Sequence, residues 1–200
     1  MQRAFWRSMA GLVVAAFTAT IAVETIVARE QAAQAPRRSG ESLAPFVPTP
    51  QDVVERMLAL AQVTSNDVVY DLGSGDGRLV VTAAKKFGAR GVGIDIDPAR
   101  IAEGKANATR AGVEGRVEFR QQDALEVDLS EASVVTLYLL SSSNVKLRPR
   151  LQSQLKAGSR IVSHQFGMGD WQPDKIETFT DSNGTSRTLY LWTIKPGGNP

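Results

Sequence analysis

The stretch that decides the fold is Val68-Val-Tyr-Asp-Leu-Gly-Ser-Gly-Asp-Gly77. Its first half is mostly apolar, which is typical of a buried strand, and glycine then recurs at every second position. Glycine lets the backbone turn sharply and approach a ligand without a Cβ in the way. Apolar residues at helical spacing follow from Leu79 to Phe87, and Gly88 is placed to end that helix. A strand, a glycine turn and a helix in this order predict the start of a parallel α/β sheet.

The remainder of the chain alternates between helical and strand patterns from about residue 50 onward. We predict helices at 51–61, 79–87, 98–111 and 145–155, and strands at 68–72, 91–95, 117–120, 134–140, 159–163, 175–180 and 187–194. The last two strands flank the turn cluster Asp181-Ser-Asn-Gly184, which favours a hairpin. The predicted fold class is therefore α/β, with a seven-stranded, mostly parallel sheet, a C-terminal antiparallel hairpin and helices on both faces.

The composition excludes several classes of function. The 23 Lys and Arg residues nearly balance the 21 Asp and Glu residues, and a net charge of +2 does not indicate a nucleic-acid partner. The chain has no cysteine, so it has no disulfide framework. Its single histidine, His164, cannot form a cluster of soft metal ligands, and we predict no metal site.

The N-terminal region carries the pattern of a targeting segment. Arg3 and Arg7 precede an apolar run from about Met9 to Val23, which continues to Ala28 if Glu24 is tolerated near an interface. A small-residue cleavage pattern follows at residues 33–35. A cleaved secretory signal and a retained membrane anchor both fit this pattern, because the run reaches the length at which a spanning helix becomes possible. We therefore divide the chain into a signal or anchor at 1–28, a linker at 29–44 and a folded domain at 45–200.

Three clusters of polar residues follow three predicted strands, at the edge where an open parallel sheet binds its ligands. Asp71 at the end of the first strand can accept a hydrogen bond from a ligand ammonium group, next to the glycine turn. Asp95 ends the second strand at the position from which an acidic side chain reaches ribose hydroxyls, whereas Asp97 precedes a proline and is favoured as a helix cap. Asp123 follows the third strand, where a loop cap and an adenine contact are the alternatives. A dinucleotide site would require glycine where Arg78 stands.

These motifs, in this order, resemble those of the Rossmann-like class I S-adenosylmethionine-dependent methyltransferases. The segment Pro45-Phe-Val-Pro-Thr-Pro50 ahead of them resembles the small protein-lysine methyltransferases related to the enzyme that acts on the c-subunit of ATP synthase. The resemblance implies S-adenosylmethionine as the cofactor and a flap formed by the segment around Thr49 and Pro50. It implies that Asp71, Gly73, Ser74 and Gly75 hold the methionine end, Asp95 the ribose, Ile96 one face of the adenine, and Asp123 with Ala124 the adenine edge.

The acceptor side is less informative. After the fourth strand the chain reads Tyr138-Leu-Leu-Ser-Ser-Ser-Asn144, without the Asn/Asp-Pro-Pro-Tyr/Phe arrangement of enzymes that methylate adenine or glutamine amino groups. Tyr138 is the candidate catalytic residue, because an aromatic side chain can line a channel for an alkylammonium group. A tyrosine packed in the core is the equal alternative. His164, at the end of the fifth strand, is expected at the same rim.

The leading functional hypothesis is methyl transfer to a lysine of a protein substrate, with membrane proteins among the candidates and no nucleic-acid partner. A small-molecule methyltransferase and a non-catalytic S-adenosylmethionine-binding protein are the alternatives. We expect the N-terminal segment to anchor the domain on the cytoplasmic side of a membrane, because the methyl donor is made in the cytosol. Export after signal cleavage is the alternative.

Overall fold

The computed structural model describes residues 42–197. The predicted N-terminal signal or anchor and most of the linker lie outside this range. The helices are α2 (Gln51–Leu60), α3 (Arg78–Phe87), α4 (Pro98–Ala111) and α5 (Ser141–Gln154). The strands are β1 (Val68–Leu72), β2 (Arg90–Asp95), β3 (Val117–Gln121), β4 (Val134–Leu137), β5 (Arg160–His164), β6 (Lys175–Thr180) and β7 (Ser186–Thr193). Between residues 42 and 197 no helix is both long and apolar enough to span a bilayer.

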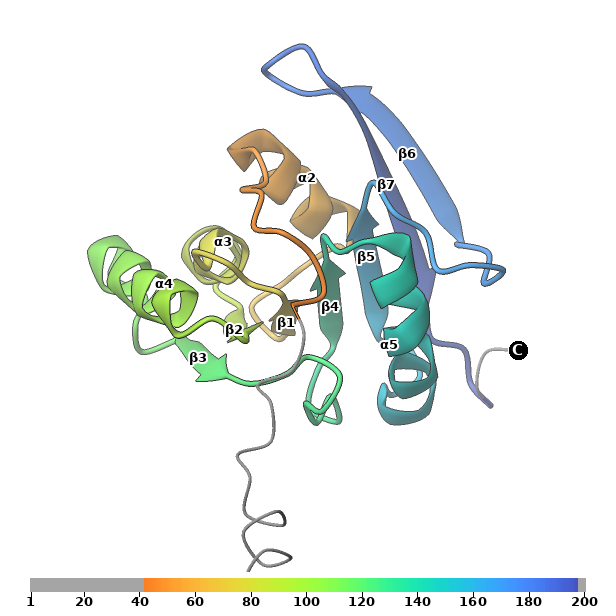
Figure 1. Ribbon diagram of the computed structural model, residues 1–200, viewed down its shortest axis with the longest axis horizontal. Coiled ribbons are helices and arrows are strands. Elements are labelled where there is room, and N and C mark those ends of the chain that lie inside the picture. The colour runs from red at the N-terminus through yellow and green to blue at the C-terminus, as the bar shows by residue number, and fades with distance from the viewer. Residues whose placement is uncertain (1–41, 198–200) are drawn as a thin grey trace, which may run out of the picture. The chain divides into compact units, whose positions relative to one another are not determined.

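All seven strands form one sheet in the order β3-β2-β1-β4-β5-β7-β6 (Figure 1). The five strands from β1 to β5 are parallel to one another, whereas β7 pairs antiparallel with both β5 and β6. The strand order reverses between β1 and β4, and in such sheets the ligand crevice lies at this point, beyond the carboxyl ends of the strands. The predicted fold class is confirmed, including the antiparallel hairpin at the end of the chain.

Helices cover both faces of the sheet, so the core has two main layers (Figure 1). On one face, Leu147 and Leu151 of α5 pack with sheet residues such as Leu137 and Ile161. On the other face, α2 and α3 pack with residues such as Val69 and Val134, and α4 lies beside α3. The buried aliphatic side chains stabilise this arrangement by about 1.5–3 kcal/mol each relative to exposure. The loops at the strand ends are thereby held on a rigid base.

Local sequence signals explain where the central helices begin and end. The Asp97 carboxylate accepts a hydrogen bond from the Ala99 N–H at the start of α4, and Pro98 occupies the first turn. Asp97 is therefore a helix cap, as predicted. Gly88 and Gly112 end α3 and α4 in the left-handed conformation that glycine adopts most easily. Because α3 follows β1 and α4 follows β2, both helices start at the edge of the sheet where these strands end.

Two neighbouring boundary predictions are wrong. The strand predicted over 134–140 ends at Leu137, and α5 begins at Ser141 rather than at Val145. Serine and asparagine are weak helix formers, so Ser141-Ser-Ser-Asn144 reads as a loop. Tertiary contacts outweigh this preference, because the buried Ser143 and Asn144 both make side-chain hydrogen bonds to distant segments. As a consequence Tyr138 lies just beyond β4 and not inside a strand.

Candidate functional site

A pocket of about 280 Å³ lies beyond the carboxyl ends of the central strands. The nine residues assigned to the cofactor and the acceptor all line this pocket, namely Asp71, Gly73, Ser74, Gly75, Asp95, Ile96, Asp123, Ala124 and Tyr138. His164, expected at the same rim, is buried and does not line it. The segment 42–49 also lines it, so the expected flap includes Thr49 and the residues before it. We call residues 42–50 the flap. The structure brings the predicted residues together, whereas their individual roles stay predictions.

The glycine turn after β1 is held against β2 by backbone hydrogen bonds. The N–H groups of Gly73 and Ser74 both donate to the Ile94 carbonyl at 2.9 Å. Gly75 has a φ of +52°, and a Cβ at this position would lie 2.4 Å from Cε2 of Phe46 in the flap. A side chain is excluded there both by the backbone conformation and by the flap. The turn therefore presents bare backbone to the pocket.

Asp95 organises this part of the pocket. Its Oδ2 accepts a hydrogen bond from the Gly75 N–H at 2.8 Å, and its Oδ1 accepts one from the Asp97 N–H at 3.0 Å. Each carboxylate oxygen retains a lone pair for a ligand hydroxyl. The predicted ribose contact is thus compatible with a second task, which is to fix the glycine turn and the entry to α4.

Asp71 is a buried carboxylate without a cationic partner among the described residues. Its Oδ1 accepts a hydrogen bond from the Thr136 hydroxyl at 2.8 Å. Burial raises the pKa of Asp71 to about 7, against the effect of the Thr136 hydrogen bond, and the nearby carboxylates Asp95 and Asp76 add to the rise. A positively charged ligand group beside Asp71 would restore its ionised form. This carboxylate therefore fits a ligand that carries an ammonium group.

Asp123 is a loop cap that also lines the pocket. The Asp123 Oδ1 accepts a hydrogen bond from the Leu125 N–H at 2.8 Å, which makes it a loop cap. It nevertheless lines the pocket together with Ala124, which is buried. A capping carboxylate can still accept from a ligand through its second oxygen.

Tyr138 lines the pocket and packs against two aromatic side chains, His164 and Phe166, that do not line it. Tyr138 is half-buried, its ring centroid lies 4.1 Å from that of His164, and Phe166 stacks on it at 6.3 Å. His164 is fully buried, and neither of its ring nitrogens has a hydrogen-bond partner in the described part of the chain. Burial lowers the pKa of His164 to about 4, and the Arg187 charge adds to the effect. His164 is therefore neutral at physiological pH. It packs against the ring of Tyr138.

Sequence reasoning missed Asn144 and Ser163, which hold Phe166 beside Tyr138. Gln165 has a φ of +66°, and the turn that it forms places Phe166 beside Tyr138. Asn144 Nδ2 donates to the Phe166 carbonyl at 3.1 Å, and the Ser163 hydroxyl donates to the same oxygen at 2.6 Å. Neither residue belongs to a recognisable motif, so no sequence signal indicates this clamp.

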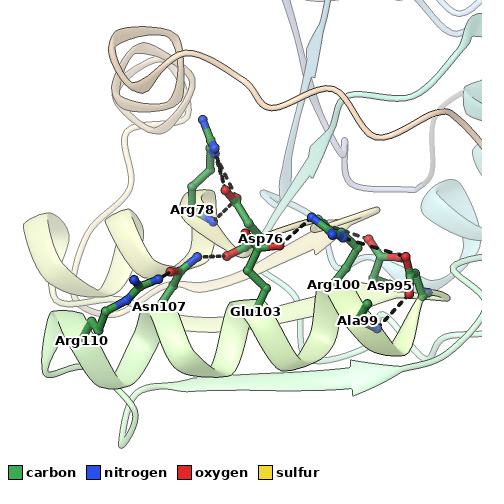
Figure 2. A network of polar contacts seen from close by, with 10 residues as sticks. Asp76, Arg78, Asp95, Ala99, Arg100, Glu103, Asn107 and Arg110 are labelled. Atoms are coloured by element: carbon green, nitrogen blue, oxygen red, sulfur yellow. Dashed lines mark hydrogen bonds and ion pairs between the residues drawn. The ribbon is translucent and has the colours of Figure 1, made fainter.

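The charged side chains of the pocket are mostly acidic. Five aspartates line it, namely Asp71, Asp76, Asp95, Asp97 and Asp123. The lining also contains Arg78 and Arg100, and each of these is paired (Figure 2). Arg78 Nη2 lies 2.6 Å from Asp76 Oδ2, and Arg100 Nη1 lies 2.5 Å from Glu103 Oε2. The pocket as a whole favours a cationic ligand.

Comparisons with known proteins agree with this geometry. The model of the ANTKMT methyltransferase domain matches residues 71–175. A protein-lysine N-methyltransferase of Saccharolobus islandicus is 46% identical over 151 residues, which cover 75% of this chain and 93% of the relative. The human lysine N-methyltransferase of the ATP synthase c-subunit is 31% identical over 132 residues, which cover 66% of this chain and 56% of that protein.

A solved structure extends the likeness to the cofactor. The crystal structure of an RNA methyltransferase from Salinibacter ruber, in complex with S-adenosyl-L-homocysteine, is 58% identical and superposes with a TM-score of 0.69. The match covers 74% of this chain and 94% of that chain. The buried Asp71, the bare glycine turn and the acidic lining fit the ammonium and sulfonium charges of S-adenosylmethionine. The chain therefore belongs to the ANTKMT methyltransferase domain family and is an S-adenosylmethionine-dependent methyltransferase.

Proposed function

We propose that this methyltransferase acts on the side-chain amine of a lysine in a protein. The acidic lining of the pocket carries the proposal, because its five aspartates attract a cationic side chain and repel a phosphate backbone, and its two arginines are already paired with carboxylates. The likeness to the protein-lysine N-methyltransferase of Saccharolobus islandicus, which extends over 93% of that relative, supports it further.

The surroundings of the entrance favour a polypeptide over a small molecule. Four of the five large apolar side chains that are exposed within residues 42–197 belong to the flap or to the start of α5, namely Phe46, Val47, Leu140 and Val145. The flap and α5 are in contact, because the Ser143 hydroxyl donates to the Leu43 carbonyl at 2.6 Å. Apolar side chains gathered beside a pocket are typical of surfaces that bind another chain.

The residues divide the chemical work as follows in this proposal. S-adenosylmethionine supplies an electrophilic methyl group, and transfer requires an unprotonated amine in line with the breaking bond. Asp71 and the glycine turn hold the methionine end, and Asp95 holds the ribose. Tyr138 lies against the alkyl chain of the acceptor lysine and excludes water from it. The acidic lining draws the lysine ammonium to the entrance, and solvent takes its proton there before the neutral amine reaches the methyl group, so no side chain has to act as a base.

RNA is the second candidate acceptor, because the 58% identical structure from Salinibacter ruber is described as an RNA methyltransferase. An RNA acceptor needs lysine and arginine side chains that contact phosphates. The arginines that line this pocket already pair with Asp76 and Glu103. The charges that line the pocket therefore favour a protein lysine over RNA as the acceptor.

A labelling experiment separates these acceptors. The full chain is incubated with S-adenosylmethionine carrying a tritiated methyl group, and with either a cell protein extract or total RNA. Each product is then treated with protease or nuclease, and the protein fraction is hydrolysed for amino-acid analysis. We expect nuclease-resistant, protease-sensitive label that is recovered as ε-methyl-lysine.

Each other outcome has a defined meaning. Label in RNA would contradict the protein acceptor, and label only in the small-molecule fraction would indicate a small-molecule methyltransferase. Absence of label, with S-adenosylhomocysteine binding intact, would indicate a binding protein without catalysis. The Asp95→Ala variant serves as the background control, because it lacks the predicted ribose contact.

We further propose that residues 1–28 anchor the protein in a membrane with the domain 45–200 on the cytoplasmic side. The support is chemical, because the methyl donor is made in the cytosol and its fixed charges make unaided membrane crossing costly. Protease added to intact cells should spare the domain, and a reporter fused after Pro200 should register the cytoplasm. A mature N-terminus near Pro36 would instead demonstrate a cleaved signal.

A further inference from the structure

The flap is tied at both ends and exposed in its middle. Near its start the Leu43 carbonyl accepts a hydrogen bond from Ser143, and near its end the Thr49 carbonyl accepts one from Arg78 Nη1 at 2.7 Å. Between these two points Phe46 is 49% exposed and Val47 is 54% exposed. The middle of the flap can therefore lift from the pocket while its ends stay in place.

Phe46 closes a ring of contacts through the cofactor site. Its side chain lies on Gly75, and the Gly75 N–H donates to Asp95 Oδ2 at 2.8 Å. Asp95 Oδ1 accepts from the Asp97 N–H, and Asp97 Oδ2 lies 3.9 Å from Arg100 Nε. The guanidinium carbon of Arg100 lies 4.6 Å from the centroid of the Phe46 aromatic ring, so the series of contacts returns to Phe46. The flap and the predicted ribose carboxylate therefore belong to one network.

Arg100 is held in the orientation that this contact needs. It projects from the first turn of α4, where Figure 2 shows it close to Asp95 and joined to Glu103. A guanidinium group that is fixed by carboxylates loses little freedom when it stacks on an aromatic ring. The planar face of Arg100 is thus available to Phe46, whereas its nitrogens are engaged with acidic side chains.

We infer that Arg100 is a positioning residue that keeps Phe46 closed over the pocket, and that breaking this contact limits the release of S-adenosylhomocysteine. Gly75 permits the closure because it has no side chain. Asp95 links the closure to occupancy, because the same carboxylate orients the glycine turn and the start of α4. The inference concerns the cofactor product alone and does not depend on which acceptor the enzyme methylates.

The test is the dissociation rate of S-adenosylhomocysteine, measured by rapid mixing of the preformed complex with excess S-adenosylmethionine. Arg100→Ala and Phe46→Leu should each accelerate dissociation by about three- to tenfold, which is the range of a partly exposed cation–π contact. The double variant should be no faster than the single variants, because both remove the same contact. Phe46→Trp retains an aromatic face, so S-adenosylhomocysteine should dissociate from it about as slowly as from the unaltered protein.

The control is Arg110→Ala on the same helix, since Arg110 donates to Asn107 away from the flap (Figure 2). Its dissociation rate should equal that of the unaltered protein. Hydrogen exchange of residues 42–50 without ligand gives a second measurement, and it should rise in Arg100→Ala and stay unchanged in Arg110→Ala. Unchanged dissociation and exchange in Arg100→Ala, or independent multiplying effects in the double variant, would overturn the inference. Thermal melting verifies that each variant is folded.

Discussion

The predicted cofactor residues and the proposed acceptor residues are positioned in different ways. On the cofactor side, Asp95, Asp97 and Asp123 each accept a hydrogen bond from the backbone N–H two residues later. These are local turns, and each one leaves a recognisable pattern in the sequence. On the acceptor side, Tyr138 and His164 come from the ends of separate strands. Turns formed by neighbouring residues can therefore be predicted from the sequence, whereas packing between distant segments cannot.

We expect the largest change in affinity when Asp95 is replaced and a much smaller one when the neighbouring Asp97 is replaced. Asp95→Ala should weaken S-adenosylhomocysteine binding by about 10- to 100-fold, because charge-assisted hydrogen bonds contribute about 1.5–3 kcal/mol each. Asp97→Ala should change binding by less than about threefold, and should instead lower the free energy of unfolding by about 1 kcal/mol through loss of the helix cap. Calorimetric titration and urea denaturation measure the two quantities. The reverse ranking of affinities would assign the ribose contact to Asp97.

The next effect concerns the pH dependence of the cofactor side. With the pKa of Asp71 at about 7, the carboxyl group is increasingly protonated below that pH in the free protein. A ligand ammonium group needs the ionised form, so affinity for S-adenosylhomocysteine should fall by about tenfold for each pH unit below 7 and level off above it. Asp71→Asn should bind weakly at every pH without this slope. A pH-independent affinity in the unaltered protein would remove Asp71 from the ligand contacts.

The acceptor side should respond in stability and not in cofactor affinity. Burial holds the pKa of His164 at about 4, below its ordinary value of 6.5, so the folded state disfavours the charged form. This group therefore makes the fold lose stability as the pH falls from 6.5 toward 4, by roughly 1–3 kcal/mol in total.

His164→Phe should abolish that part of the acid sensitivity and keep the stack on Tyr138. Urea denaturation at pH 5 and pH 8, compared between the two proteins, isolates the contribution of His164 from that of Asp71, which has the opposite sign. Affinity for S-adenosylhomocysteine at pH 8 should stay within twofold. A large loss of affinity would mean that the two sides of the pocket are not separate.

The smallest expected effect is a null result that tests the glycine turn. Nicotinamide adenine dinucleotide should not raise the melting temperature, because Arg78 begins α3 at the position where a dinucleotide site needs its third glycine. S-adenosylhomocysteine should raise it in the same assay. Equal stabilisation by both ligands would contradict the assignment of the turn.

The same contrast explains what could be predicted from the sequence. The strands β1 and β2 and the helix α4 were predictable, because hydrophobic periodicity, Pro98 and Gly112 mark them. The start of α5 was not, because the buried Asn144 is helical only through its contacts with the turn after β5.

The candidate site divides in the same manner. Every predicted cofactor residue lies in the pocket, since glycine turns and strand-end carboxylates are patterns of neighbouring residues. The segment Pro45-Phe-Val-Pro-Thr-Pro50 indicates the flap, but no pattern indicates the contact of Phe46 with Arg100, because the two residues are 54 positions apart and meet only in the folded chain. The contact that closes the pocket is therefore harder to predict from the sequence than the residues expected to bind the cofactor.

The place of β7 in the sheet has a consequence for biosynthesis. This strand lies between β5 and β6, although it leaves the ribosome after both of them. Until residues 186–193 have been translated, the hydrogen-bonding edge of β5 has no partner strand, and β6 cannot supply one because its own neighbour is β7. An unpaired, apolar strand edge invites association with other chains. A nascent or truncated chain that ends before Ser186 should therefore aggregate or require a chaperone, whereas the completed chain closes the sheet by itself.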